Sequence, residues 1–190
     1  MVPDEFKRQL DELSTVILDG IIYFTVWDGL MVESDEAAQA LNRYRGLFLP
    51  ARNALLWMAL LQLAKVFDRD PRTVSFRNLI SAAKENREDL TPHATEEDLN
   101  QIQQQVDDNE ALLERLKRLR DQRIAHHDST TSGDRTVLFG ELQRLVEEIK
   151  SMYNSLRRGH DRACIAFDVP IGDAERHTSE VVRIMCEDRD

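Results

Sequence analysis

Apolar residues recur at steps of three and four along nearly the whole chain, the spacing that places side chains on one face of an α-helix. The first stripe consists of Leu10, Leu13, Ile17, Ile21, Phe24 and Trp27. This pattern predicts a long helix over Asp4–Leu30. Ser34 is a favourable N-cap residue, so a second helical segment is expected to begin at Asp35.

The second segment runs from Asp35 to Phe67 and contains Pro50. A proline inside a helical pattern either kinks one helix or begins a new one, here at Ala51. The most apolar run, Ala54–Phe67, is shorter than the roughly 20 residues that a membrane span needs. It is therefore predicted to be a buried helix, and Asp68-Arg69-Asp70-Pro71 is most simply its stop.

Capping signals mark the next two helices. Ser75 is the expected N-cap of a short helix from Phe76 to about Asn86, and Thr95 with Asp98 resembles a capping box. The capping box is predicted to open one long helix that continues to about Ala125. Its inward stripe is Leu99, Ile102, Val106, Leu113 and Leu116.

The last part of the chain follows the same pattern less regularly. Residues 129–134 are typical of a turn, and a helix is predicted over Val137–Arg158. Its inward positions are Leu142, Leu145, Val146, Ile149, Met152, Tyr153 and Leu156. Cys164–Val169 is expected to be a short extended piece before Pro170, followed by a terminal helix over Asp173–Cys186.

Length and composition agree with an all-α fold. The chain has 190 residues, of which 42% are hydrophobic and 32% charged, and it contains only 7 Gly and 5 Pro. Such a chain buries a core without disulfide staples and is poor in turn residues. We predict an antiparallel four- to five-helix bundle over residues 1–160 and a C-terminal extension with a short helix over 161–190.

The net charge of −10 makes broad contact with duplex DNA or an anionic membrane unfavourable. The two cysteines form no C-x-x-C pair, and the first residues lack the layout of a signal peptide. We therefore expect a cytoplasmic protein without membrane association. Metal binding is not expected, because His126 and His127 are adjacent and no H-x-x-x-H or E-x-x-H pair occurs.

One basic stretch interrupts this acidic chain. From Glu114 to His127, five Lys or Arg residues stand against two acids, a local charge of +3 that leaves −13 for the rest. Basic residues near the end of a helix complement its dipole and often form a solvated face. However, Arg120 and Arg123 project within about 40° and 20° of Leu116 on a helical wheel, so they extend the apolar stripe. Cations there require a cleft, a partner subunit or an anion.

The segment from Leu119 to Asp128 reads LRDQRIAHHD. It resembles the R-x(4–6)-H motif of the HEPN family, with Arg120 as the arginine, His126 as the histidine and the usual polar residue supplied by Asp121. The form LRDxxxAHxD is most similar to the abortive-infection U-type HEPN proteins. The stretches Leu60–Arg69 and Ser75-Phe76 also resemble that group, and the likeness covers roughly residues 5–160.

The resemblance implies a metal-independent endoribonuclease without a cofactor, in which two subunits face their motifs toward one cleft. The 2′-OH of RNA is the nucleophile, His126 is the implied acid or base, and Arg120 is the implied phosphate clamp. Asp121, Arg123 and His127 are implied supporting or RNA-binding residues. A strict helix favours His127 as the residue facing the cleft, whereas the family pattern favours His126.

The implied partners are RNA, a second copy of the chain and an antitoxin or other protein. Some HEPN proteins are nucleotidylated on a Tyr two residues after the motif histidine, but Asp128 occupies that position here. Two other function classes stay open. One is a non-catalytic HEPN module that binds RNA or a protein, or acts as a dimerisation scaffold. The other is a plain helical bundle whose basic stretch only caps a helix.

Overall fold

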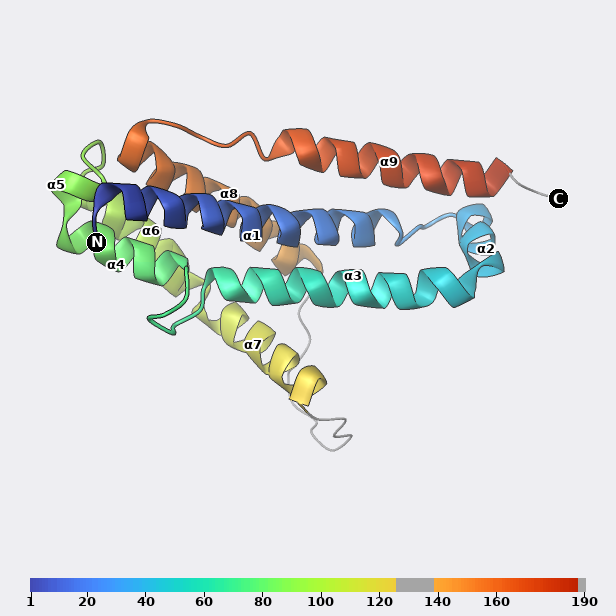
Figure 1. The fold of residues 1–190 in the computed structure, drawn as a ribbon. Helices are drawn as coiled ribbons and strands as arrows, with labels where there is room; N and C mark the ends of the chain where they lie inside the picture. Colours follow the sequence, from blue (N-terminus) through green and yellow to red (C-terminus); the bar gives the residue numbers. More distant parts are fainter. Residues whose placement is uncertain (126–138, 188–190) are drawn as a thin grey trace. The chain divides into compact units, whose positions relative to one another are not determined.

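The computed structural model describes residues 1–125 and 139–187, with the backbone alone for 120–125 (Figure 1). These residues form helices and no strand, which confirms the all-α prediction. The helices are α1 (Pro3–Gly29), α2 (Asp35–Arg43), α3 (Arg45–Val66), α4 (Phe76–Glu85), α5 (Arg87–Leu90), α6 (Glu96–Asp108), α7 (Glu110–Ala125), α8 (Phe139–Asp161) and α9 (Asp168–Glu187).

The chain folds into two compact units. The first unit comprises Met1–Ile17 and Gln62–Ile165, and the second comprises Leu18–Leu61 and Ala166–Asp190. Helices α1 and α3 each contribute residues to both units. The separation of residues 1–160 from 161–190 stays a prediction.

The first unit is built around the predicted stripes. All seven predicted inward positions of α8 are buried, as are the five of α6 and α7. Tyr153 lies fully buried in this core, and its hydroxyl donates a hydrogen bond to the Leu10 carbonyl of α1 at 3.2 Å. Burial raises the pKa of Tyr153, because the charged phenolate is disfavoured away from water.

Arg157 joins α1 to α8 at the edge of the same core. Its guanidinium contacts Asp11 at 2.5 Å and Asp161 at 2.8 Å, with 11% of its side chain exposed. Burial disfavours the charged guanidinium, but the hydrogen bonds that it donates to the two aspartates outweigh that effect and raise the pKa of Arg157. The pair with Asp11 therefore fixes the position of α8 against α1.

The expected helix from Thr95 to Ala125 is divided in two, so that prediction is wrong at Asn109. The Thr95–Asp98 capping box is confirmed, and α6 ends at Asp108. The Asn109 side chain, 4% exposed, donates to the Gln105 carbonyl at 2.9 Å and to the carboxylate of Glu148 in α8 at 2.5 Å. An asparagine that satisfies a terminal carbonyl in this way ends a helix, which the apolar spacing did not reveal.

Of the two alternatives at Pro50, the start of a new helix at Ala51 is wrong. Helix α2 ends at Arg43 and α3 begins at Arg45, while Pro50 lies inside α3. The carbonyl of Tyr44 accepts from amides of the first turn of α3, so this helix starts five residues before the proline. Only one turn of α3 precedes Pro50, and its missing N–H leaves a single carbonyl, that of Gly46, without an intrahelical partner.

Helix α3 is buried only over its last part. Ala59, Leu60, Leu63 and Val66 are buried, but Leu47 is 65% exposed and Met58 38%. The prediction of a buried helix over Ala54–Phe67 is therefore wrong for the residues before Ala59. Among the described helices, α3 is the one whose length and hydropathy would permit a membrane span, a test that the core helix of a soluble protein also passes.

In the second unit, α9 starts at Asp168, five residues earlier than expected. Pro170 is its third residue, a position where a missing N–H costs no helical hydrogen bond. A Cβ placed on Gly29 of α1 would lie 2.7 Å from Cγ2 of Thr178, so the glycine allows α1 and α9 to approach closely. Arg43 of α2 donates to the Met185 carbonyl near the end of α9.

Candidate functional site

Helix α7 carries the basic stretch, and its burial pattern sets the register of the candidate residues. Leu112, Leu113 and Leu116 are buried. Because the helix is continuous to Ala125, Arg120 and Arg123 occupy register positions in line with that stripe. Helix α7 extends to Ala125, as predicted, and the residues that follow lie outside the described part of the chain.

The structure brings only part of the predicted site onto one element. Arg120, Asp121 and Arg123 lie on the last turns of α7, where the backbone is described. His126 and His127 lie outside the described residues, so the pairing of Arg120 with either histidine stays a prediction. The predicted turn over residues 129–134 also lies outside them.

The start of α7 is fixed by ion pairs to the segment that follows α3 and to α4. Glu110 pairs with both Arg69 and Arg77, and Arg77 also reaches Asp107 at 3.6 Å. The Arg77 side chain is only 20% exposed, and its Nε has no hydrogen-bond partner. A carboxylate shared by two guanidiniums is held firmly, which fixes where α7 leaves the core.

Sequence reasoning missed Arg77 and Glu110, although one signal was present. Arg77 is the second residue of α4, where the positive end of the helix dipole disfavours a cation. A basic residue in that place indicates a nearby carboxylate. The predicted end of the helix at Asp68-Arg69-Asp70 is confirmed, since α3 ends at Val66. Arg69 also contacts Glu110 of α7.

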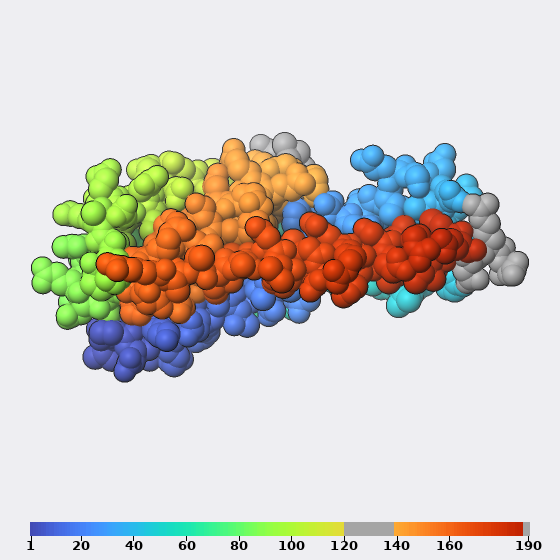
Figure 2. Space-filling model, turned by 90° about the horizontal axis from the view of Figure 1, so that it is seen from above, coloured from blue at the N-terminus to red at the C-terminus, as the bar shows by residue number. Residues whose placement is uncertain are grey.

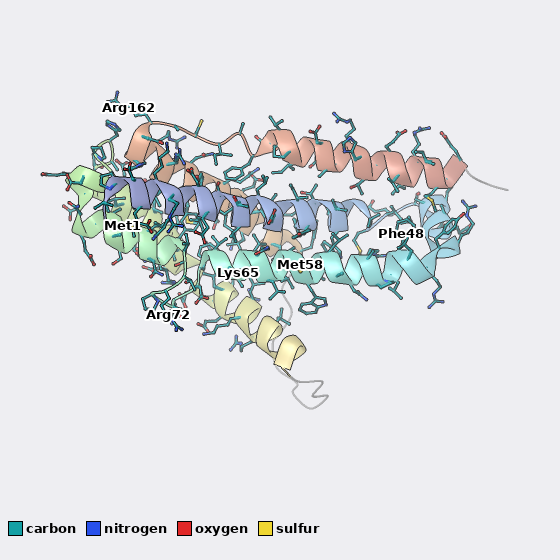
Figure 3. The ribbon with its side chains drawn as sticks, in the orientation of Figure 1. Met1, Phe48, Met58, Lys65, Arg72 and Arg162 are labelled. Atoms are coloured by element: carbon teal, nitrogen blue, oxygen red, sulfur yellow. The ribbon has the colours of Figure 1, made fainter. Side chains whose placement is uncertain are left out.

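These residues border a small cleft in the first unit, beside the first turns of α7. Its lining includes Asp68, Arg69 and Arg77 from the α3–α4 region and Glu114 and Lys117 from α7. Figure 3 marks Lys65 at the neighbouring end of α3 and Arg72 in the loop before α4. The cleft holds both signs of charge, and its carboxylates already neutralise Arg69 and Arg77.

The basic residues of α7 differ in what they contact. Arg115 forms an ion pair with Glu141 of α8 at 2.5 Å, so it holds two helices together. Lys117 and Arg118 are exposed, and neither has an acidic partner among the described residues. The interpretation in which the basic stretch only caps a helix therefore does not account for Arg115. The last turns of α7 carry more basic than acidic residues.

Comparison with known proteins defines the class. The described residues fold into helices alone. The AbiU2 family of HEPN domains matches residues 3–181, and the chain belongs to this abortive-infection family. No curated protein and no solved structure gives a match.

Proposed function

We propose that the protein is a metal-independent endoribonuclease of a phage-defence or toxin system, with Arg120 and His126 as its catalytic pair. The observation that carries this proposal is the register of α7. A buried stripe ending at Leu116 continues into the positions of Arg120 and Arg123, and the described part of the helix extends to Ala125. Cations placed in line with a buried stripe are suited to a site where an anion or a partner covers them.

The chemistry follows from the two side chains. A neutral imidazole of His126 takes the proton of the RNA 2′-OH, or its imidazolium donates a proton to the leaving 5′-oxygen. The guanidinium of Arg120 holds the phosphate by two parallel hydrogen bonds and stabilises the charge that develops on it. The products are a 2′,3′-cyclic phosphate and a 5′-hydroxyl. Asp121, Arg123 and His127 support RNA binding.

The proposal includes a homodimer, in which two motifs share one cleft. The second unit supports self-association, because the first turns of α3 present apolar side chains to water. Tyr44 is 47% exposed, Leu47 65% and Leu49 50%. Side chains of this size gathered on one short segment favour contact with another protein surface. An antitoxin or another partner protein is the alternative occupant, and the proposed compartment is the cytoplasm.

The alternative function is a non-catalytic HEPN module that binds RNA or a partner protein. The net charge of −10 favours it, since an acidic surface repels RNA away from the basic end of α7. This alternative predicts binding without strand cleavage.

The test is RNA cleavage in EDTA by wild type and by the Arg120→Ala variant. Arg118→Ala is the matched control, because Arg118 is exposed on the same helix and lies about 200° from Leu116 on the helical wheel. We expect Arg120→Ala to lose at least about 100-fold in rate, in line with the loss of a transition-state hydrogen-bond donor, while Arg118→Ala keeps most of its activity. Equal activity in the wild type and Arg120→Ala would refute the proposal.

The same assay distinguishes the roles of the two histidines. His126→Ala is expected to lose at least about 100-fold in rate, and His127→Ala much less. The reverse result would keep the ribonuclease and move the acid–base role to His127, as a strict helix would place it.

A further inference from the structure

A second group of basic residues lies in the first unit, between the α5–α6 connection and the C-terminal end of α8. Arg87, His93, Arg158 and Arg162 line an open pocket of about 530 Å³. Figure 3 marks Arg162 at this end of the molecule, and Figure 2 shows the end of α8 in orange beside the green residues of this region. The pocket is within the size range of small-ligand sites, roughly 300–1,000 Å³.

The pocket is built by a close approach of two backbones. Gly159 of α8 has no side chain to keep the 91–95 connection away, since a Cβ there would lie 2.8 Å from the Cβ of Ala94. The amide of His93 donates to the Gly159 carbonyl at 2.9 Å, and Arg87 Nη1 donates to the Ala94 carbonyl at 2.8 Å. These bonds fix the wall that carries Arg87 and His93 against the helix that carries Arg158.

The three arginines of this pocket have no carboxylate partner among the residues that the structure describes. The Arg158 guanidinium donates to the Ser155 hydroxyl at 3.3 Å, and one nitrogen of Arg87 donates to the Ala94 carbonyl. Arg157, one residue before Arg158, pairs with two aspartates. The pocket therefore keeps an excess of positive charge, although the chain as a whole has a net charge of −10.

Three of the acids next to the pocket in the chain are already engaged. Asp161 is held by Arg157, Asp89 accepts from Asn86, and Asp98 accepts from the amide and hydroxyl of Thr95. The hydrogen bond from Thr95 also holds the pKa of Asp98 below its usual range. None of these carboxylates neutralises the three guanidiniums.

Arg162 adds a conformational observation. Its φ is 60°, and it is the one described non-glycine residue with a positive φ. Its amide donates to the Arg158 carbonyl at 3.1 Å and so closes the last turn of α8, a place where glycine is normally preferred. An arginine at this position has a strained backbone conformation, and such conformations are frequent at ligand-binding sites.

We propose that this pocket binds a ligand with two or more adjacent phosphate groups, either a free nucleoside polyphosphate or the 5′-phosphorylated end of an RNA. Three guanidiniums that line one pocket match several negative charges better than the single charge of one phosphodiester. Arginine recognises phosphate oxygens through paired N–H donors, and the pocket is open enough for the rest of the ligand to extend into solvent. The proposal does not depend on the ribonuclease assignment of α7.

The experiment is calorimetric titration of the full chain with inorganic pyrophosphate. The test variant is Arg158→Ala/Arg162→Gly, which removes two guanidiniums and relieves the strained backbone. The control is Lys7→Ala/Lys84→Ala, which removes the same charge from two exposed lysines outside the pocket. We expect the pocket variant to bind at least about tenfold more weakly than the wild type and the control variant to bind like the wild type.

Thermal unfolding is the control for correct folding of the pocket variant. Its melting temperature should equal or exceed that of the wild type, because glycine is the preferred residue at a left-handed position. Wild type that does not bind pyrophosphate, or a pocket variant that binds it equally well, would overturn the proposal. ATP and a short RNA with a 5′-triphosphate then distinguish the sources. Tighter binding of the RNA than of its 5′-hydroxyl form and of ATP assigns the RNA end, and comparable binding of ATP assigns a free nucleotide.

Discussion

Gly159 is the residue whose replacement has the most clearly defined structural consequence. Alanine at this position places a Cβ 2.8 Å from the Ala94 Cβ and 3.6 Å from the Thr91 Cβ. The first distance is well inside van der Waals contact, and the Ala94 methyl group has no rotamer that would relieve the clash. The substitution must therefore push the 91–95 connection away from α8.

The size of the effect follows from two opposing contributions. Alanine gains about 1 kcal/mol over glycine in a helix interior, whereas overpacking a tight contact costs typically 1–3 kcal/mol. Gly172 of α9 supplies the matched control, because a Cβ there meets nothing within 4 Å. The difference between Gly159→Ala and Gly172→Ala isolates the cost of the clash. We expect a difference of about 1–3 kcal/mol, with Gly172→Ala the more stable variant.

Chemical denaturation of both variants measures this difference in the free energy of unfolding. For a protein of this size, each 1 kcal/mol corresponds to roughly 2–4 °C in melting temperature. Because Gly159 also forms the wall of the arginine pocket, Gly159→Ala should weaken pyrophosphate binding as well. Equal gains in stability from the two alanines would refute the close approach of α8 and the 91–95 connection.

Three further changes test individual contacts. Tyr153→Phe removes the hydrogen bond to the Leu10 carbonyl and should cost about 1 kcal/mol in denaturant unfolding. Thr95→Ala removes the capping box of α6 and should also cost about 1 kcal/mol, with a loss of helical circular dichroism. Burial, and then the negative charge of Glu175, raise the pKa of Asp28, so its ionised form destabilises the fold. Asp28→Asn should therefore raise the melting temperature at pH 7, and this gain should disappear as the pH falls through the raised pKa.

Hydrophobic spacing was sufficient to predict the helices that bury a continuous stripe. The stripes of α6, α7 and α8 are buried where the pattern placed them, because a helix in this fold gains most of its stability from one apolar face. The stripe of α1 is buried from Leu10 to Phe24, whereas Trp27 is half-buried. The caps at Ser75 and Thr95 were also predictable, since each side chain bonds to an amide three residues later.

The helix breaks could not be predicted in the same way. At Asn109 the apolar stripe continues from α6 into α7, so the pattern predicts an uninterrupted helix. The break depends on a side chain that bonds to the Gln105 carbonyl and to Glu148, 39 residues further along the chain. The arginine pocket depends in the same way on contacts between distant residues, since Gly159 lets α8 approach Ala94, whose carbonyl accepts from Arg87.

The candidate motif was found from its position on a stripe and from its likeness to a family. The family is confirmed, while the roles of Arg120 and His126 remain the proposal that experiment must decide. The described part of α7 supports the register of Arg120, and the ion pairs of Glu110 and Arg115 hold the helix that carries it.

The most direct test is the chemistry of the RNA ends produced in EDTA by wild type and by Arg120→Ala. Attack by the 2′-OH leaves fragments with 2′,3′-cyclic phosphate and 5′-hydroxyl ends, and these should form with the wild type and not with Arg120→Ala. Fragments with 5′-phosphate ends, or cyclic-phosphate fragments formed equally by both proteins, would contradict an Arg120-dependent ribonuclease.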